Sequence, residues 1–338
     1  MSLSFKYTAF RRFCPKFAVI SINTSVLSII ICSKSPKLAG KLKQNIELTV
    51  GIPFECIFID NSTCNYSIFS AYNEGIRRSQ YPYLCFLHED VAFQTADWGK
   101  NLCSHLMNPR VGLIGLCGSA YQSKVPASWS LYEYTAHIVQ SDKRGKLRIF
   151  EPSDGYDDRH EKHIVALDGV FLAARRELFK HIAFDENTFD GFHAYELDLC
   201  LQSHILGYKN LAVNDILLIH FSKGRHNEDW VHNILLFVDK WEHYLPIEIG
   251  DHSHERIAQR ETTYMRKTFL KNLIRSGYSN QDCKHLLMKH LSHDLSFVEW
   301  VRSPKFDRWL FSMRLKKKPS TLFKRPASRI AQDVSAIS

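Results

Sequence analysis

The length and composition of this chain predict a folded protein with a sizeable core. Its 338 residues are 45% hydrophobic and 23% charged, which excludes a disordered or fibrous chain and suffices for one large domain with an appendage. No apolar run reaches the roughly 20 residues that a membrane-spanning helix needs. The nine cysteines are scattered and form no Cys-x-x-Cys pair, which predicts a reducing, cytoplasmic setting.

The net charge of +9 is unevenly distributed. Residues 1–250 carry a balance of −1, whereas residues 251–338 carry +10. We therefore expect a main domain over 26–250, a helical extension over 251–315 and a basic, disordered tail over 316–338. Residues 1–25 are interpreted as an irregular lead-in, because their apolar run is short for a signal peptide and no clear cleavage pattern follows it.

Strands alternate with helices in the first part of the chain. The expected elements are strands over 26–32, 54–59, 83–93 and 111–116, and helices over 38–50, 68–76 and 98–106. This alternation predicts repeated β-α-β units and an α/β fold with a mainly parallel sheet flanked by helices.

The pattern changes in the second part of the chain. Residues 119–159 lack a clear period, which predicts a functional loop or lid. A strand over 164–172 follows, then a short helix over 175–179 and a helix over 197–205. A strand over 211–219 is expected to deliver His220 at its end.

The segment over 83–93 carries the first chemical signal. Its apolar residues lead directly into Glu89 and Asp90, so these acids are expected at the carboxyl end of a buried strand, where ligands bind in open α/β sheets. Two carboxylates predict a site for Mg²⁺ or Mn²⁺, with Asp90 as the favoured ligand. The alternative is a solvated turn, and His88 is a further candidate or a structural histidine.

Two more acids follow or begin predicted strands. Asp60 closes the second strand and could accept hydrogen bonds from a ribose or a base, or else serve as a turn residue. Asp168 precedes Gly169, which permits close backbone approach, and could bind a sugar or acceptor hydroxyl, or else only form a turn.

A second strong segment contains Glu196 and Asp198. These residues are two apart, so on a helix they face different ways and only one can point into a site. A carboxylate buried there would have a raised pKa, as a general base needs. His220 could be a late metal ligand or a phosphate contact, or else a structural histidine. The basic loop with Lys223, Arg225 and His226 could neutralise a diphosphate or simply face solvent.

Together these segments resemble the family 2 glycosyltransferases of the GT-A (Rossmann-like) fold, and more narrowly the glycosyltransferase-like domain named after a streptomycin-biosynthesis protein. The likeness spans roughly residues 26–245. It rests on Ile59-Asp60-Asn61-Ser62, Ala71-Tyr72-Asn73-Glu74-Gly75-Ile76, Phe86-Leu87-His88-Glu89-Asp90-Val91, Leu167-Asp168-Gly169-Val170-Phe171 and Gly191-Phe192-His193-Ala194-Tyr195-Glu196-Leu197-Asp198-Leu199-Cys200.

The resemblance implies an inverting transferase for polysaccharide biosynthesis, with a nucleotide-diphosphate sugar as donor and Mn²⁺ or Mg²⁺ as cofactor. It implies donor binding by Asp60, metal binding by Asp90 and base catalysis by Glu196. The expected donor-site residues are Ser33, Asp60, Asn73, Glu89 and Asp168, and the expected metal ligands are Asp90 and His220. The run His88-Glu89-Asp90 departs from the usual aspartates, and Asp198 remains an alternative base because the adjacent acidic pair of the family is absent.

The acceptor is expected to be a glycan or a lipid-linked glycan. One alternative is a module that binds nucleotide sugars or glycans without transferring them. Another is a nucleotidyltransferase, which is disfavoured because residues 33–37 contain no glycine or arginine.

The tail has its own alternatives. With Trp300, Trp309, Phe311, Leu322 and Phe323, the basic C-terminal part could lie on the inner face of a membrane, or its helices could simply pack together. It has no recognised nucleic-acid-binding motif, so a nucleic-acid partner is not expected.

Overall fold

A seven-stranded sheet forms the centre of the chain. The computed structural model describes residues 27–315 except 143, 153, 154, 223, 225 and 293, so the expected lead-in and tail lie outside the described residues. The strands of this sheet are, in spatial order, β11 (Glu161–Ile164), β14 (Lys209–Val213), β5 (Val111–Gly115), β13 (Phe171–Arg175), β3 (Tyr83–Leu87), β1 (Leu27–Ser33) and β2 (Phe54–Asp60).

Most strands of this sheet run in one direction. β1 pairs in parallel with β2 and β3, and β14 pairs in parallel with β5. β13 lies antiparallel between β3 and β5, and β11 is antiparallel to β14. The prediction of an α/β fold with a mainly parallel sheet is therefore confirmed.

Smaller sheets and helices complete the chain. The short strands are β4 (Val91–Phe93), β6 (Cys117–Ser119), β7 (Tyr121–Gln122), β8 (Tyr134–Ala136), β9 (Ile138–Ser141), β10 (Leu147–Phe150), β12 (Ala166–Leu167), β15 (Leu218–His220) and β16 (Ile247–Glu248). The α-helices are α1 (Pro36–Thr49), α2 (Ile68–Arg78), α3 (Trp98–Leu106), α4 (Tyr195–Ile205), α5 (Glu228–Lys240), α6 (His254–Tyr264), α7 (Leu270–Arg275), α8 (Asn280–His290), α9 (Leu295–Arg302) and α10 (Pro304–Leu315). Two 3₁₀ turns, Trp129–Leu131 and Arg176–Lys180, and a π-turn at Met265–Phe269 connect them.

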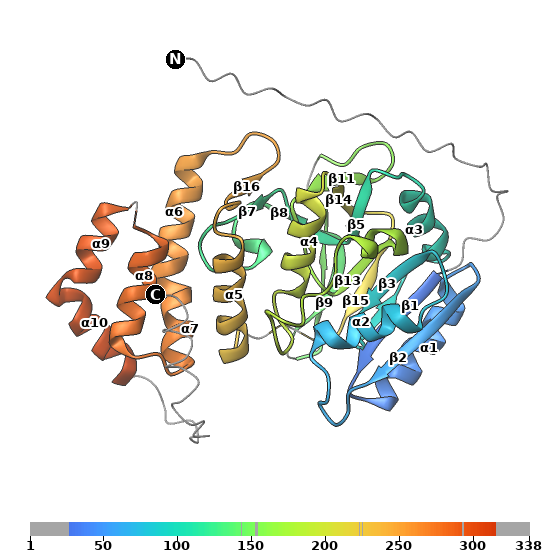
Figure 1. The fold of residues 1–338 in the computed structure, drawn as a ribbon, viewed down its shortest axis with the longest axis horizontal. Coiled ribbons are helices and arrows are strands. Elements are labelled where there is room, and N and C mark those ends of the chain that lie inside the picture. The colour runs from blue at the N-terminus through green and yellow to red at the C-terminus, as the bar shows by residue number, and fades with distance from the viewer. Residues whose placement is uncertain are drawn as a thin grey trace, which may run out of the picture.

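Alternating side chains of the sheet bury into two separate cores. Ile30 and Phe86 point into a core that α2, α4 and α5 cover, whereas Ile31 and Leu87 point into a core that α1 and α3 cover. This period of two is what a strand buried on both faces requires. The result is a sheet between two helical layers (Figure 1).

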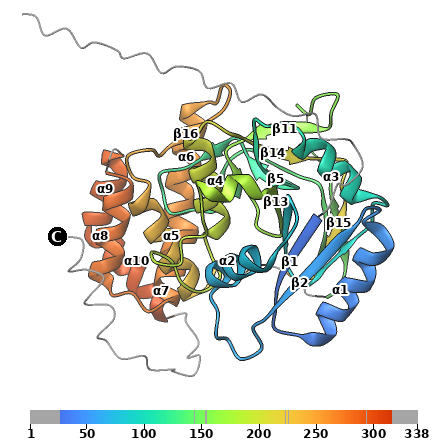
Figure 2. The same cartoon turned by 45° about the vertical axis from the view of Figure 1, so that its right-hand side comes forward.

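The first core continues into the C-terminal helices. It contains Phe237 of α5 together with Leu273, Leu287 and Phe297 of the later helices. Figure 1 places α6–α10 beyond α5, on the side away from α1, and α8, α9 and α10 lie on that side in Figure 2 as well. Residues 254–315 are thus largely helical, as the sequence predicts.

The tryptophans of these helices pack inward. The ring of Trp300 lies 4.8 Å from Phe306 and 5.3 Å from Trp309, and the Arg266 guanidinium lies 4.3 Å from its centroid. This arrangement supports helix packing rather than membrane contact for both tryptophans, although Phe311 is exposed. Leu322 and Phe323 lie outside the described residues. Among the helices described, none combines the length and the apolar character needed to cross a bilayer.

Several boundary predictions were wrong. The strand expected over 83–93 is two strands, β3 and β4, in different sheets, because the polar residues 88–90 turn the chain between them. The strands expected over 164–172 and 211–219 are also interrupted, and the helix expected over 175–179 is a 3₁₀ turn. The segment over 119–159 contains short strands rather than only loop, since those strands are too brief to show a period.

Candidate functional site

Three strand ends bring the predicted site residues to one edge of the sheet. In the parallel register Ser33 is paired with Asp60, and Ile31 is paired with Leu87, the last residue of β3. The chain then turns through residues 88–90 into β4. Acids that the sequence places after separate strands therefore reach the same carboxyl edge, where α/β folds bind ligands.

His220 reaches this edge through a different sheet. β15 lies antiparallel to β4, with His220 paired with Val91, and the Phe221 amide donates to the Asp90 carbonyl oxygen at 3.0 Å. This pairing holds His220 beside Asp90, although 130 positions of the chain separate them. The histidine ends β15, as expected.

His88, Asp90 and His220 form a cluster of potential metal ligands. One ligand atom from each residue lies within 4.8 Å of the others. His220 Nε2 lies 3.6 Å from Asp90 Oδ1, and the two imidazole rings are 5.5 Å apart. Residues brought together in this way, two from the turn between β3 and β4 and one from the end of β15, can share one cation.

The hydrogen bonds of Tyr195 orient the His88 ring. The Tyr195 hydroxyl donates to the Gly169 carbonyl oxygen at 2.9 Å and lies 2.9 Å from His88 Nε2. Because a hydroxyl has only one proton to donate, His88 Nε2 must carry the hydrogen of the second bond. We infer that His88 Nδ1 keeps its lone pair for the cluster.

Gly169 allows this contact. A Cβ atom at this position would lie 2.1 Å from the Tyr195 hydroxyl oxygen. The close backbone approach that Gly169 was expected to permit is therefore present, and the group that approaches is the hydroxyl of Tyr195, which supports His88.

Gln140 orients His220 in the same manner. The Gln140 amide nitrogen donates to the carbonyl oxygens of His220, at 3.1 Å, and Ser222. Its Oε1 atom then faces His220 Nδ1 at 3.2 Å and can only accept. His220 Nδ1 therefore carries the hydrogen of this bond, and the other ring nitrogen, Nε2, faces Asp90.

The electrostatics of the cluster suit a divalent cation. Burial, together with the nearby His220, lowers the pKa of His88 to about 4, so its ring is neutral at pH 7. Burial alone would raise the pKa of Asp90, but its interactions with His220 and Ser222 hold it below its usual range. Two imidazoles and one carboxylate fit a transition metal such as Mn²⁺ better than Mg²⁺, which prefers oxygen ligands.

Glu89 faces the loop between β1 and α1. Its Oε2 atom accepts hydrogen bonds from the Ser33 hydroxyl at 2.6 Å, the Lys34 amide at 3.1 Å and the Ser35 amide at 3.0 Å. Glu89 thereby fixes the shape of the loop that contains Ser33. Its expected direct contact with the donor stays a prediction.

Asp60 is exposed at the end of β2. Its Oδ1 atom accepts from the Ser62 amide at 2.9 Å, which lowers its pKa. These contacts match the alternative in which Asp60 serves as a turn residue. Asp60 is also paired with Ser33 at the strand ends, and its role in binding a nucleoside stays a prediction.

Asp168 and Glu196 lie close enough to influence each other. Asp168 accepts hydrogen bonds from Trp129 Nε1 at 2.9 Å and from the Val170 amide at 2.8 Å. Burial raises the pKa of Glu196 to about 8, and the negative charge of Asp168 adds to the shift. Glu196 occupies the first turn of α4, directly after the Tyr195 that supports His88.

The backbone before Glu196 is strained. Ala194, which precedes α4, has a φ of 68°, in the left-handed region. A non-glycine residue there costs about 1 kcal/mol or more, and such strain concentrates at functional sites.

The hydrogen bonds of Asp198 give it a structural role. Its Oδ1 atom accepts from Lys240 at 2.7 Å and Trp241 at 2.8 Å, and its Oδ2 atom accepts from Gln202 at 2.7 Å. Asp198 is buried and connects α4 to α5. Glu196 is consequently the better candidate for a base.

Two expected contributions are not found at the cluster. The Asn73 amide donates to the Phe184 carbonyl oxygen at 2.8 Å and to Glu186 at 3.1 Å, and Asn73 lines a separate cavity of about 470 Å³. Its role in donor binding stays a prediction. Lys223 and Arg225 lie outside the described residues, whereas the His226 ring stacks on Trp230.

The sequence gives little sign of the supporting residues. His88 was only a weak candidate, and neither Tyr195 nor Gln140 was expected to contribute. The position of His88 beside two acids was the one available signal. The orienting hydrogen bonds join residues about 80 to 107 positions apart, so no local pattern reveals them.

Comparison with known proteins identifies the family. The model of a glycosyltransferase-like family matches residues 28–244, well over half of the chain. The chain belongs to this family. It is a glycosyltransferase with the GT-A fold, so the expected family, fold and enzyme class are confirmed.

Individual relatives of this glycosyltransferase are distant. A protein described as ATP synthase subunits region ORF 6, from Fuscovulum blasticum, is 25% identical over 219 residues, which cover 62% of this chain and 81% of that protein. The structure of S. aureus TarS 1–349 has a TM-score of 0.50 at 11% identity, covering 88% of this chain and 93% of that one. The structure of GalNAc-T7 with UDP, GalNAc and Mn²⁺ has a TM-score of 0.43 at 11% identity, covering 82% of this chain but only 58% of that one.

Proposed function

We propose that this glycosyltransferase uses a divalent metal to move a sugar from a nucleotide-diphosphate donor to a hydroxyl of a glycan or lipid-linked acceptor, with inversion at the anomeric carbon. The observation that carries the proposal is the His88–Asp90–His220 cluster at the carboxyl edge of the sheet. The hydrogen bond from His88 to Tyr195 connects this cluster to the helix turn that holds Glu196. A metal site and a high-pKa carboxylate thus share one neighbourhood.

Each residue has a distinct role in this proposal. Asp60 and the Ser33 loop, held by Glu89, bind the nucleoside and its phosphates. His88, Asp90 and His220 hold the cation, for which the two imidazoles favour Mn²⁺. The bound cation supplies charge neutralisation for the departing diphosphate.

Glu196 acts on the acceptor. Its carboxylate takes the proton of the acceptor hydroxyl as the new bond to the anomeric carbon forms and the bond to the diphosphate breaks. Asp168 lies near Glu196, and it positions the transferred sugar together with Trp129, whose indole donates to it. In this single displacement the acceptor oxygen attacks the anomeric carbon from the face opposite the departing diphosphate, so the configuration at that carbon is inverted.

The remaining expectations belong to the same proposal. A role in polysaccharide biosynthesis, the streptomycin-type subfamily, a cytoplasmic location and contact of the basic tail with a membrane stay predictions. Vesicle co-sedimentation at low and high salt tests the membrane contact, because electrostatic binding is lost as salt rises.

Turnover of a panel of nucleotide sugars tests the assigned roles. Asp90→Asn and Glu196→Gln should each lower turnover by a factor of about 10² or more, the usual contribution of a catalytic base. Glu47→Gln, on the exposed face of α1, is the matched control for loss of a carboxylate. Full turnover in both site variants would contradict the roles, and donor binding without turnover in the wild type would favour the non-catalytic binding module.

A further inference from the structure

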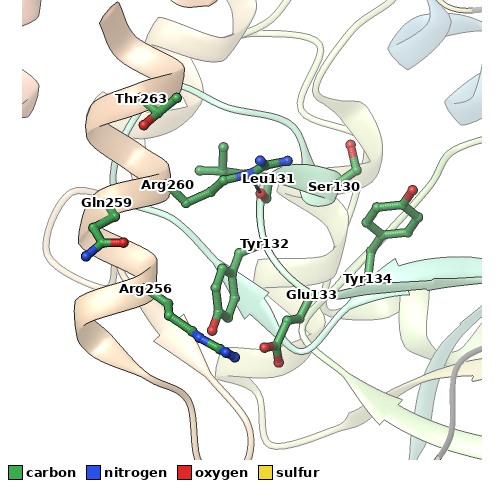
Figure 3. A pocket seen from close by; sticks show the side chains of 9 residues that line it. All are labelled: Ser130, Leu131, Tyr132, Glu133, Tyr134, Arg256, Gln259, Arg260 and Thr263. Atoms are coloured by element: carbon green, nitrogen blue, oxygen red, sulfur yellow. Dashed lines mark hydrogen bonds between the residues drawn. The ribbon is translucent and has the colours of Figure 1, made fainter.

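A separate cavity of about 590 Å³ lies between α6 and the segment that joins β7 to β8. Its volume is typical of small-molecule sites. The lining residues are Ser130, Leu131, Tyr132, Glu133, Tyr134, Arg256, Gln259, Arg260 and Thr263 (Figure 3). None of them belongs to the metal cluster or to the proposed donor site.

Two arginines make one wall of the cavity cationic. Arg256 and Arg260 are four residues apart, so they lie on the same face of α6. Arg260 Nε donates to the Leu131 carbonyl oxygen at 3.1 Å, which fixes its guanidinium at the opening. The Arg256 guanidinium has no hydrogen bond or ion pair with any residue that the structure describes, and it extends from α6 toward Tyr132 and Glu133 (Figure 3).

The opposite wall combines groups that suit a sugar. Tyr132 is 8% exposed, and its hydroxyl is buried without a hydrogen-bond partner among the described residues. Tyr134 is exposed and offers a ring face, and the Glu133 carboxylate can accept hydrogen bonds from sugar hydroxyls. Glu133 has a φ of 28°, so the loop holds a strained conformation at this wall.

The cavity adjoins the catalytic residues through Trp129. The Trp129 and Tyr134 rings are 5.5 Å apart in an edge-to-face arrangement. Trp129 Nε1 donates to Asp168, whose charge acts on Glu196. A ligand against Tyr134 therefore lies one aromatic residue, Trp129, away from Asp168, which is near the proposed base Glu196.

We propose that this cavity is an acceptor subsite and that the acceptor carries an anionic group, a carboxylate or a phosphate ester, which Arg256 and Arg260 bind. This inference rests on the proposed transferase function. A planar guanidinium matches either anion with paired hydrogen bonds, whereas a neutral sugar would leave Glu133 as the one acid among the lining residues to balance two arginine charges.

Direct binding tests the subsite without any donor. The probes are methyl β-D-glucuronide for a carboxylate, glucose 6-phosphate for a phosphate ester and methyl β-D-glucoside as the neutral analogue, each titrated into the full chain by ligand-observed NMR. We expect one anion to bind at least about ten times more tightly than the glucoside, as one good charged contact allows.

Variants separate the subsite from general surface charge. Arg256→Gln should lower binding of that anion to the level of the glucoside and leave the fold intact, because this side chain has no partner among the described residues. Arg308→Gln, which removes an exposed arginine of α10, is the matched control and should change nothing. Equal binding of anion and glucoside, no binding of either anion up to about 10 mM, or unchanged binding by Arg256→Gln would overturn the proposal.

A second readout distinguishes this inference from the proposed function. Slow hydrolysis of the nucleotide sugar by water needs the donor site but no acceptor. Arg256→Gln should keep this hydrolysis while raising the acceptor KM, whereas Asp90→Asn should lose hydrolysis and keep anion binding. Normal hydrolysis by Asp90→Asn would refute the proposed function, and an unchanged acceptor KM in Arg256→Gln would refute the acceptor subsite.

Discussion

Removal of one hydroxyl group tests how the metal cluster is oriented. In Tyr195→Phe, the Gly169 carbonyl oxygen and His88 Nε2 both lose a partner at 2.9 Å. The Gly169 carbonyl is buried and His88 is half-buried, so the free energy of unfolding should fall by about 1–3 kcal/mol. The His88 ring also loses the contact that selects its tautomer.

Metal affinity should fall together with stability. Loss of such a supporting partner typically weakens binding about 10- to 100-fold, which is about 1.4–2.7 kcal/mol. Calorimetric titration with Mn²⁺ measures the affinity, and thermal unfolding without metal measures the stability.

A matched variant separates the two effects. Tyr264→Phe removes a hydroxyl that donates to the Pro126 carbonyl oxygen at 3.0 Å, away from the cluster. It should lower stability and leave the Mn²⁺ affinity unchanged. If Tyr195→Phe is also destabilised but binds Mn²⁺ within twofold of the wild type, Tyr195 does not orient a metal ligand.

Three further predictions concern acid–base chemistry, the donor loop and stability. Because Glu196 must be deprotonated to act as a base and its pKa is raised to about 8, kcat/KM should rise with pH up to about that value, and Glu196→Gln should abolish this dependence. Glu89→Ala should raise the donor KM about tenfold, since the β1–α1 loop loses three hydrogen bonds to a carboxylate. His105→Gln should lower the free energy of unfolding by about 3 kcal/mol, because His105 is buried between Glu161, at 2.8 Å, and Asp215, at 3.1 Å.

The pH dependence of the His105 effect has a definite sign. Burial opposes the charged ring, but hydrogen bonds to Asp215 and Glu161 raise the pKa of His105 above its usual value. A group whose pKa is higher in the folded state than in the unfolded state stabilises the protein fully at a pH below its unfolded-state pKa. This stabilisation is lost as the pH rises through its folded-state pKa. The deficit of His105→Gln in chemical denaturation should therefore be largest below about pH 6.5 and shrink at higher pH. A stability deficit of His105→Gln that grows with pH would contradict this assignment. A kcat/KM that is flat between pH 6 and 9 would contradict the role of Glu196 as base. An unchanged donor KM in Glu89→Ala would contradict the role of Glu89 in the donor loop.

Local patterns were sufficient to predict the strands that build the site. Apolar runs located β1, β2 and β3, and the polar residues after them located Asp60 and Asp90. Their meeting at one edge follows from parallel pairing alone. A local pattern also predicted the helix at 197–205, because its apolar positions recur with the helical period.

Contacts between distant segments could not be predicted in this way. The change of sheet between β3 and β4 depends on pairing with β15, more than 120 residues further along. Glu89 and Asp90 are neighbours in sequence, yet one binds a loop backbone and the other faces two histidines. Only the three-dimensional arrangement distinguishes Glu196 from Asp198, since Lys240 and Trp241 come from another helix.

An anomalous-scattering experiment on crystals with Mn²⁺ and a nucleotide-diphosphate sugar tests the central claim most directly. We predict one manganese peak in contact with His88 Nδ1, Asp90 and His220 Nε2, with the diphosphate on its open side and the Glu196 carboxylate facing the anomeric carbon. A manganese ion bound elsewhere, or a sugar whose anomeric carbon is turned away from Glu196, would contradict it.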